Sequence, residues 1–166
     1  DLTVHTMPPV TKKSIELVPG KHNFVAVDAP QGELTLEVEG GAGFTNIPCL
    51  VREKGTGEIV NVQNFNTSRK YIVGKYDLEI LTLPRIEHKD FNILSGKENL
   101  VRIPKPGQLT MQAGDAGIVS IYISKDDKLQ KVYESTGFAG RETIKIQPGQ
   151  YQVVFRPNRN KRATAT

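Results

Sequence analysis

Residues 76–84 read Tyr76-Asp77-Leu78-Glu79-Ile80-Leu81-Thr82-Leu83-Pro84, a stretch that follows Gly74, alternates polar and apolar side chains, and ends at a proline. Alternation with a period of two is typical of a β-strand that buries one face. The same pattern recurs at residues 1–8 and at residues 149–157. This recurrence predicts that the chain repeats one β-rich unit.

The repeat extends well beyond this strand. A shift of 76 positions aligns residues 1–27 with residues 77–103 without a gap, and a shift of 75 then brings Gly74 and Tyr76 onto Gly149 and Tyr151. The identical residues within the first alignment are Asp1, Leu2, Thr6, Pro8, Lys13, Gly20, Lys21, Asn23 and Val25. The one-residue slip falls where Pro30-Gln31-Gly32 becomes Pro106-Gly107, residue types that favour a tight turn.

Each unit is expected to contain about seven short strands, enough for two sheets packed face to face. In the first unit the predicted strands are residues 24–27, 34–38, 49–52, 58–62, 71–73, 76–84 and 90–94. Residues 54–57 are predicted to form a hairpin turn. Residues 124–133 begin like a capped helix, but their counterpart contains Gly55 and Gly57, so we interpret Asp126-Asp127 as a hairpin turn.

The predicted fold class is therefore all-β, with two tandem immunoglobulin-like or prealbumin-like antiparallel β-sandwiches. Residues 1–18 are expected to be the terminal strands of a preceding repeat, residues 19–94 the first sandwich and residues 95–166 the second, with its last strand missing. Residues 85–88 are expected to serve as a linker. An orphan amino-terminal hairpin together with an exposed sheet edge favours strand exchange between chains, and hence a strand-exchanged homo-oligomer.

The composition is that of a globular protein without a membrane-spanning segment. Of the 166 residues, 37% are hydrophobic and 24% charged, and no apolar run approaches the roughly 20 residues needed to cross a bilayer. The absence of an initiator methionine and of a signal-like segment indicates a processed or excised chain. Part of the net charge of +4 comes from Arg156, Arg159, Lys161 and Arg162, which are candidates for contact with an anionic surface rather than with nucleic acid, because no aromatic residue accompanies them.

Several stretches resemble a known family. Residues 148–153, Pro148-Gly149-Gln150-Tyr151-Gln152-Val153, resemble the closing strand of carboxypeptidase-regulatory-like and related prealbumin-like modules. Residues 20–32 and 73–85 are similar to the region that follows the von Willebrand factor A domain in exported proteins of Bacteroides-type bacteria. The resemblance implies an extracytoplasmic, multidomain protein in which such modules are spacers or adhesion surfaces. The Asp-x-Ser-x-Ser signature of the A domain's ion site is not in this sequence, so the resemblance implies no metal ligand here.

No pattern in the sequence points to catalysis, a cofactor or a metal. His5, His22 and His88 lack metal-ligand spacing, Cys49 has no basic neighbour that would activate its thiol, and residues 40–43 precede no helix that could bind phosphate. Asp126 and Asp127 are too few for calcium. Gly74, Tyr76, Gly149 and Tyr151 are expected to be structural anchors, with each tyrosine hydroxyl reaching a backbone group.

These observations predict a non-enzymatic structural or interaction module of a larger exported protein, which acts as a spacer or a protein-binding surface without a cofactor. Its partners would be other proteins or neighbouring domains of the same polypeptide, not nucleic acid. The alternative is a carbohydrate-binding accessory module, which would need an exposed face carrying Tyr71, Tyr122 or Tyr133.

Overall fold

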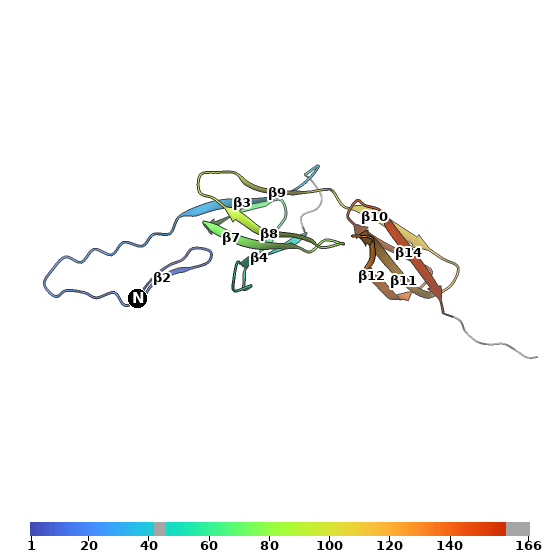
Figure 1. The fold of residues 1–166 in the computed structure, drawn as a ribbon, viewed down its shortest axis with the longest axis horizontal. Coiled ribbons are helices and arrows are strands. Elements are labelled where there is room, and N and C mark those ends of the chain that lie inside the picture. Colours follow the sequence, from blue (N-terminus) through green and yellow to red (C-terminus); the bar gives the residue numbers. More distant parts are fainter. Residues whose placement is uncertain (42–45, 159–166) are drawn as a thin grey trace, which may run out of the picture. The chain divides into compact units, whose positions relative to one another are not determined.

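The computed structural model describes residues 1–41 and 46–158. The chain forms two compact units (Figure 1). Unit 1 consists of residues 1–81 and 85–103, and unit 2 consists of residues 82–84 and 104–166. All regular structure in the described ranges is β-strand, which confirms the predicted all-β class. No helix is present there that could cross a membrane.

Unit 1 contains two sheets that face each other across its core (Figure 1). One sheet has the order β6-β3-β9, and the other has the order β5-β4-β7-β8. Their strands are β3 (Gln31–Val38), β4 (Pro48–Glu53), β5 (Ile59–Asn64), β6 (Thr67–Ile72), β7 (Gly74–Ile80), β8 (Ile86–Ile93) and β9 (Asn99–Ile103). Every pairing is antiparallel except that of β3 with β9, which is parallel. Residues 19–94 contain six of these strands rather than the seven expected, because residues 24–27 form no strand, and β9, from the second repeat, supplies the seventh.

Alternation along the strands builds the core of unit 1. The inward side chains of β3 (Leu34, Leu36, Val38) alternate with more exposed ones, as expected of a strand with one face against a core. They pack with side chains of β4, β6 and β7, and with Ile93 from β8 and Val101 and Ile103 from β9. Because β8 and β9 contribute these three residues, none of which is more than 4% exposed, the core of unit 1 is closed by them.

A short hairpin precedes these sheets. β1 (Leu2–Val4) pairs with β2 (Val10–Lys12) in a separate two-stranded sheet. Its register, Leu2 opposite Lys12 and Val4 opposite Val10, corresponds to Leu78 opposite His88 and Ile80 opposite Ile86 in β7 and β8. The hairpin is thus built in the same way as the end of the β7–β8 pair, 76 residues further on.

Unit 2 has fewer strands than unit 1. One sheet pairs β10 (Gly107–Gln112) with β13 (Arg141–Ile146), and the other has the order β12-β11-β14, from β11 (Gly117–Lys125), β12 (Lys128–Phe138) and β14 (Tyr151–Pro157). Lys125 is paired with Lys128, while Asp126 and Asp127 have φ values of 51° and 58°. These are the values of a two-residue type I′ turn, which confirms the hairpin and excludes the helix at this place.

The two units use the same contacts at corresponding positions. Met7 accepts a hydrogen bond from the amide of Ile72 in unit 1, as Leu83 does from the amide of Gln147 in unit 2. Thr35 bonds to Ser68 across β3 and β6, and Thr110 bonds to Thr143 across β10 and β13. The internal sequence repeat is therefore accompanied by equivalent contacts in the two units.

Three local predictions differ from the structure. Residues 24–27 were expected to be a strand, and residues 14–18 to be the second of the terminal strands in residues 1–18, but neither is a strand, although residues 90–93 and 100–103, the counterparts of 14–17 and 24–27, lie in β8 and β9. Residues 86–88, expected in a linker, form the start of β8. The cause is the same in each case: a strand forms where a partner strand offers hydrogen bonds, and a single-chain pattern does not show whether that partner is present.

The compact units and the sequence repeats have different boundaries. Residues 95–103 begin the second repeat in the sequence, yet β9 pairs with β3 and belongs to unit 1. Residues 1–18, attributed to a preceding repeat, are likewise grouped with unit 1. β9, the strand that completes unit 1, therefore lies beyond the end of the first sequence repeat.

Candidate functional site

The two tyrosines of the repeat close their units in the same way. Tyr76 donates a hydrogen bond from its hydroxyl to the carbonyl of Ile72, and Tyr151 donates one to the carbonyl of Gln147, both over 2.8 Å. Burial raises the pKa of Tyr76 to about 12. At Gly149 a Cβ atom would lie 3.1 Å from the Tyr151 hydroxyl, so a glycine two residues earlier leaves room for the ring. These contacts match the structural role expected of the anchors.

The other tyrosines form no open aromatic face in the parts of the chain that are described. Tyr71 is fully buried; its hydroxyl donates to Gln63 and accepts from Asn61. Tyr133 is half-buried and donates to Glu142. Tyr122 is half-buried on β11. Of the three tyrosines whose exposure would favour a carbohydrate-binding module, Tyr71 is buried and Tyr122 and Tyr133 are half-buried.

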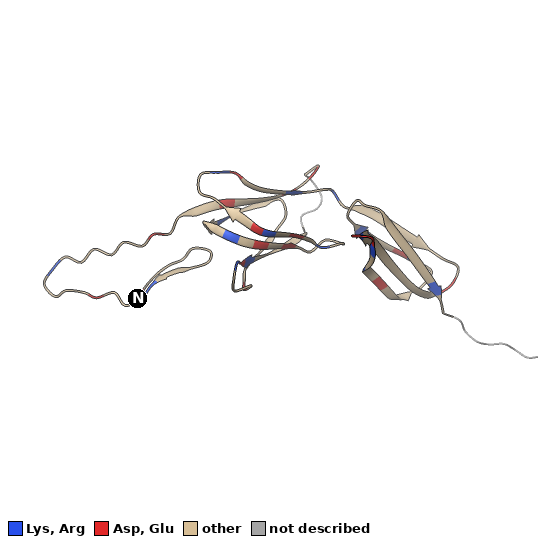
Figure 2. Ribbon diagram, viewed as in Figure 1, with Lys and Arg blue, Asp and Glu red and all other residues tan. Residues whose placement is uncertain are grey.

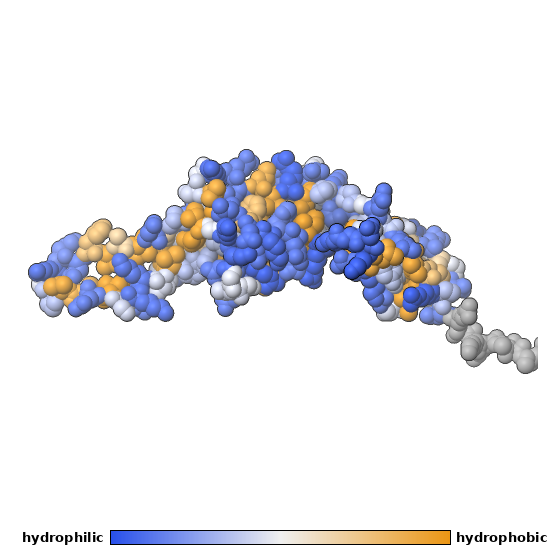
Figure 3. Space-filling model, in the orientation of Figure 1, coloured by the Kyte–Doolittle hydropathy of each residue, from blue (hydrophilic) through white to orange (hydrophobic). Residues whose placement is uncertain are grey.

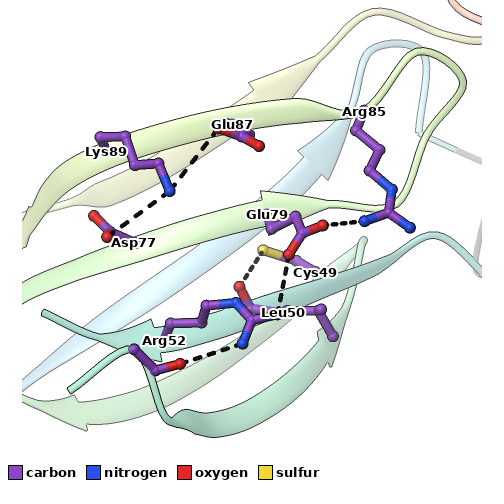
Figure 4. A network of polar contacts seen from close by, with 9 residues as sticks. Cys49, Leu50, Arg52, Asp77, Glu79, Arg85, Glu87 and Lys89 are labelled. Atoms are coloured by element: carbon purple, nitrogen blue, oxygen red, sulfur yellow. Dashed lines mark hydrogen bonds and ion pairs between the residues drawn. The ribbon is translucent and has the colours of Figure 1, made fainter. Parts of the chain in front are cut away.

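Cys49 is fully buried in β4, and burial raises the pKa of its thiol to about 12. A thiol with so high a pKa is protonated at neutral pH and is a poor nucleophile. Its sulfur lies 3.9 Å from the carbonyl oxygen of Leu50 (Figure 4). Cys49 therefore serves as a small core residue.

A row of charged side chains crosses the sheet that contains β4, β7 and β8 (Figure 4). Glu79 accepts hydrogen bonds from Arg52 on one side and from Arg85 on the other. These two guanidinium groups hold the pKa of the Glu79 carboxyl below its ordinary value. Lys89 lies 3.9 Å from both Asp77 and Glu87. The row joins neighbouring strands and contains no nucleophile beside a base.

The remaining candidate residues are dispersed. His5 and His22 lie outside the strands, and His88 lies in β8. Within residues 1–41 and 46–158, no group of three or more His, Cys, Asp or Glu side chains is arranged to hold a metal ion. Arg156 is exposed on β14, whereas Arg159, Lys161 and Arg162 fall outside the described residues. Figure 2 shows basic and acidic residues interspersed along the drawn strands.

The most distinctive surface is an open groove in unit 2 between β10 and β14. Two adjoining cavities of about 470 and 280 Å³ share Leu109 and Val153 in their linings. We call this the unit 2 groove and define it by Leu109, Met111, Gln147, Tyr151, Val153 and Phe155. Val153 is 45% exposed, whereas Leu78, at the corresponding place in unit 1, is 1% exposed. The groove thus opens the core of unit 2 to solvent.

Both strands that border the groove have an unpaired edge in the described part of the chain. β14 pairs only with β11, and β10 pairs only with β13. In unit 1 the corresponding edges are occupied, because β7 pairs with β8 and β3 pairs with β9. Unpaired edges present backbone N–H and C=O groups to any added strand. The groove and the two edges therefore form one surface suited to extended polypeptide.

Two further features of the groove are unusual. Gln147 is 6% exposed and lines the groove, yet neither atom of its side-chain amide has a hydrogen-bond partner. Buried polar groups normally have partners. A Cβ atom added to Gly107 would have one neighbour, the carbonyl oxygen of Ile146, 3.8 Å away. A Cβ atom added to the corresponding Gly32 would lie 2.4 Å from the carbonyl oxygen of Leu94. In unit 1 the space beside the glycine is filled by the end of β8.

No family model, curated protein or solved structure matches the chain. The sequence did not single out the groove residues, apart from Tyr151. The one sequence-based indication of the groove was the expected exposed edge in the second unit. The depth of the groove and the exposure of Val153 cannot be derived from the alternation of a single strand.

Proposed function

We propose that this chain is a non-enzymatic interaction and spacer module of a larger exported protein, and that it binds other polypeptide by accepting strands at the unit 2 groove. The observation that carries the proposal is the pair of unpaired edges, β10 and β14, on either side of an apolar opening. An added strand gains main-chain hydrogen bonds from an edge and inserts alternate side chains into the core.

The chemistry of the groove favours a peptide over a small polar ligand. Leu109, Met111, Val153 and Phe155 give it an apolar lining, and its two edges offer main-chain hydrogen bonds. No charged side chain other than Lys105 lines either cavity. A peptide with period-two alternation matches this arrangement, because one face would be buried and the other solvated.

A synthetic peptide with the sequence of residues 86–103, which contains β8 and β9, tests this function. Fluorescence anisotropy with the labelled peptide and the full chain should give saturable binding, since the same sequence closes the equivalent opening in unit 1. A peptide with Ile93→Lys should bind at least about tenfold more weakly, because Ile93 is a fully buried side chain. No binding of the unmodified peptide, or equal binding of both peptides, would contradict the proposal.

The proposed location is extracytoplasmic, in a polypeptide that also contains a von Willebrand factor A domain. This part of the proposal rests on the resemblance of residues 20–32 and 73–85. An antibody to the chain, applied to intact and to permeabilised cells that make the protein, tests it. Staining of intact cells, or of cells in which only the outer membrane is permeabilised, would support a surface or periplasmic location, and staining only after the cytoplasmic membrane is permeabilised would contradict the proposal.

A further inference from the structure

The segment that would complete unit 2 can be identified from the repeat. In unit 1 the two edges are covered by residues 86–103, which form β8, a turn and β9. The shift of 76 positions places residues 10–27 in correspondence with residues 86–103. Within the 166 residues given, the apolar pattern of β8 and β9 is repeated in residues 10–27.

Residues 10–27 expose the side chains that their counterparts bury. Leu17 is 66% exposed, whereas the corresponding Ile93 is fully buried. Val25 and Val27 are half-buried, whereas Val101 and Ile103 are buried. Phe24 is 87% exposed where its counterpart Leu100 is half-buried, whereas Val18, at 47%, is about as exposed as its counterpart Leu94, at 37%. Figure 3 shows apolar surface on this amino-terminal segment. The segment thus has the side chains of a core strand without a core around them.

The turn between the two future strands is already formed. The side chain of Asn23 accepts a hydrogen bond from the amide of Val18 and donates to the carbonyls of Val18 and Lys21, over 2.8, 3.1 and 2.9 Å. Asn99 makes the same three bonds with Leu94 and Lys97 between β8 and β9. A segment that already holds its bound conformation loses less conformational entropy on binding.

The repeat also determines which unit the segment completes. Leu83 is bonded to Gln147 of unit 2. The residues that follow Leu83, from Arg85 to Ile103, complete unit 1, which precedes unit 2 in the sequence. Met7 contacts unit 1 through Ile72 in the same way. By this correspondence the residues that follow Met7 complete a unit that precedes unit 1. For two copies of the chain arranged head to tail, that preceding unit is unit 2 of the other copy.

We infer that residues 10–27 of a second copy of this chain insert into the unit 2 groove and complete its two sheets. This inference rests on the proposed function and names its partner. Residues 10–17 would pair with β14, with Ile15 opposite Tyr151 and Val10 opposite Phe155, as β8 pairs with β7. Residues 23–27 would run parallel to β10, with Asn23 opposite Leu109 and Val25 opposite Met111, as β9 pairs with β3. Val18 would pass over Gly107, as Leu94 passes over Gly32.

One existing contact must be exchanged for this insertion. β2 leaves β1, with which it has three residue pairs, none of whose residues is buried. In exchange residues 10–17 gain pairing along β14 from Tyr151 to Phe155. Each copy uses its amino-terminal segment as donor and its unit 2 groove as acceptor, so the contact is heterologous and adds copies head to tail, either as an open chain or as a closed ring.

Disulfide trapping tests the pairing. Lys75 and Asn92 are outward-facing partners in β7 and β8, and their counterparts are Gln150 and Glu16. The full chain carrying E16C and Q150C should form a ladder of dimers and larger species under mild oxidation, seen on non-reducing gels. The control E16C with V154C moves one thiol four residues along β14, about 13 Å away, and should give no ladder.

The wild-type chain should also give no ladder, because its one thiol, Cys49, is buried. Absence of a ladder in E16C/Q150C, a ladder of equal strength in the control, or closure within a single chain would each overturn the inference. If the peptide of residues 86–103 still binds in that case, the proposed function stands and only the identity of the partner is wrong.

Self-association gives a second measurement. Sedimentation of the wild-type chain should show an average mass that rises with concentration. L17K should raise the dissociation constant at least about tenfold, whereas E16K, an outward neighbour, should leave it within about twofold. Both positions are exposed in the free chain, so neither variant is expected to unfold. A wild-type chain that stays monomeric at high concentration, or equal effects of the two variants, would contradict the inference.

Discussion

In each unit one tyrosine hydroxyl group donates a hydrogen bond to a backbone carbonyl beside the core. The Tyr76 ring lies 5.8 Å from the ring of Tyr71, and its hydroxyl satisfies the carbonyl of Ile72. Tyr151 makes the same bond but is half-buried, because the groove beside it is open. The same residue is therefore expected to contribute differently in the two units.

Removing these hydroxyls tests that difference. Tyr76→Phe should lower the free energy of unfolding of unit 1 by about 1–2 kcal/mol, because a carbonyl in a buried setting loses its partner. Tyr151→Phe should lower that of unit 2 by only about 0.5–1 kcal/mol, because water reaches the site. Urea unfolding followed by circular dichroism measures both. Tyr122→Phe is the control, since its hydroxyl has no hydrogen bond within the described ranges; an equal loss there would contradict a specific role of the anchors.

The Glu79 carboxylate gives unit 1 a pH dependence of known sign. Arg52 and Arg85 lower its pKa in the folded chain below the ordinary value of 4.5. The stabilisation is thus present above that ordinary value and is lost as the pH falls through the lower, folded-state pKa. Glu79→Gln should cost about 0.5–1 kcal/mol at pH 7, and this difference from wild type should shrink in acid. Thermal unfolding of Glu79→Gln from pH 7 to pH 3 measures it.

Glu87→Gln is the matched control for this effect. Glu87 lies on the neighbouring strand, and its ion pair with the exposed Lys89 is long, at 3.9 Å. Removing the charge of Glu87 should therefore have almost no effect on the free energy of unfolding at any pH. A deficit of Glu79→Gln that stays constant down to pH 3 would show that the charge of Glu79 is not what stabilises the sheet.

At the scale of the strands, two equivalent glycines distinguish the closed unit from the open one. A Cβ atom at Gly32 would lie 2.4 Å from the Leu94 carbonyl oxygen, a backbone atom that cannot turn aside. Gly32→Ala should therefore destabilise unit 1 by about 1–3 kcal/mol, the range for overpacking. A Cβ atom at Gly107 would meet only the Ile146 carbonyl oxygen, at an ordinary contact distance of 3.8 Å, so Gly107→Ala should change the unfolding of unit 2 by less than about 0.5 kcal/mol. Urea unfolding compares the two variants.

The same pair also connects stability with binding. Gly107→Ala should weaken the binding of the peptide of residues 86–103, because the end of the inserted strand must pass over this position. If Gly107→Ala binds the peptide like wild type, or if Gly32→Ala proves harmless, the correspondence between the two glycines is wrong.

Much of this element-level architecture follows from local patterns. The alternation in residues 34–38 and 76–84 predicts β3 and β7, although β7 ends at Ile80 and residues 81–84 form no strand. Asp126-Asp127 forms the predicted turn. Residues 14–18 and 24–27 have strand patterns equal to those of β8 and β9 but lie unpaired. The pattern encodes the capacity to form a strand, and a neighbour decides whether it is realised. The groove was not predicted from the sequence for the same reason. The pattern of β14 does not show that Val153 lacks the covering strand that Leu78 has in unit 1.

At the scale of the whole molecule, the chain contains one closed core and one open core. Among the described residues, the buried cluster of unit 1 has thirteen members and that of unit 2 has five. A small unit with a small core has little stability of its own. In the proposed assembly, the side chains that complete this core come from residues 10–27 of a second copy. Each copy then supplies both the donor segment and the acceptor groove.

Hydrogen exchange of the full chain, measured by mass spectrometry across a range of protein concentrations, tests the central claim most directly. In dilute solution we expect the amides of β14 to exchange much faster than those of β7, because β7 lies between two strands and β14 beside one. As the concentration rises, β14, β10 and residues 10–27 should become protected together. Equal protection of β14 and β7 in dilute solution, or protection that does not change with concentration, would contradict the account.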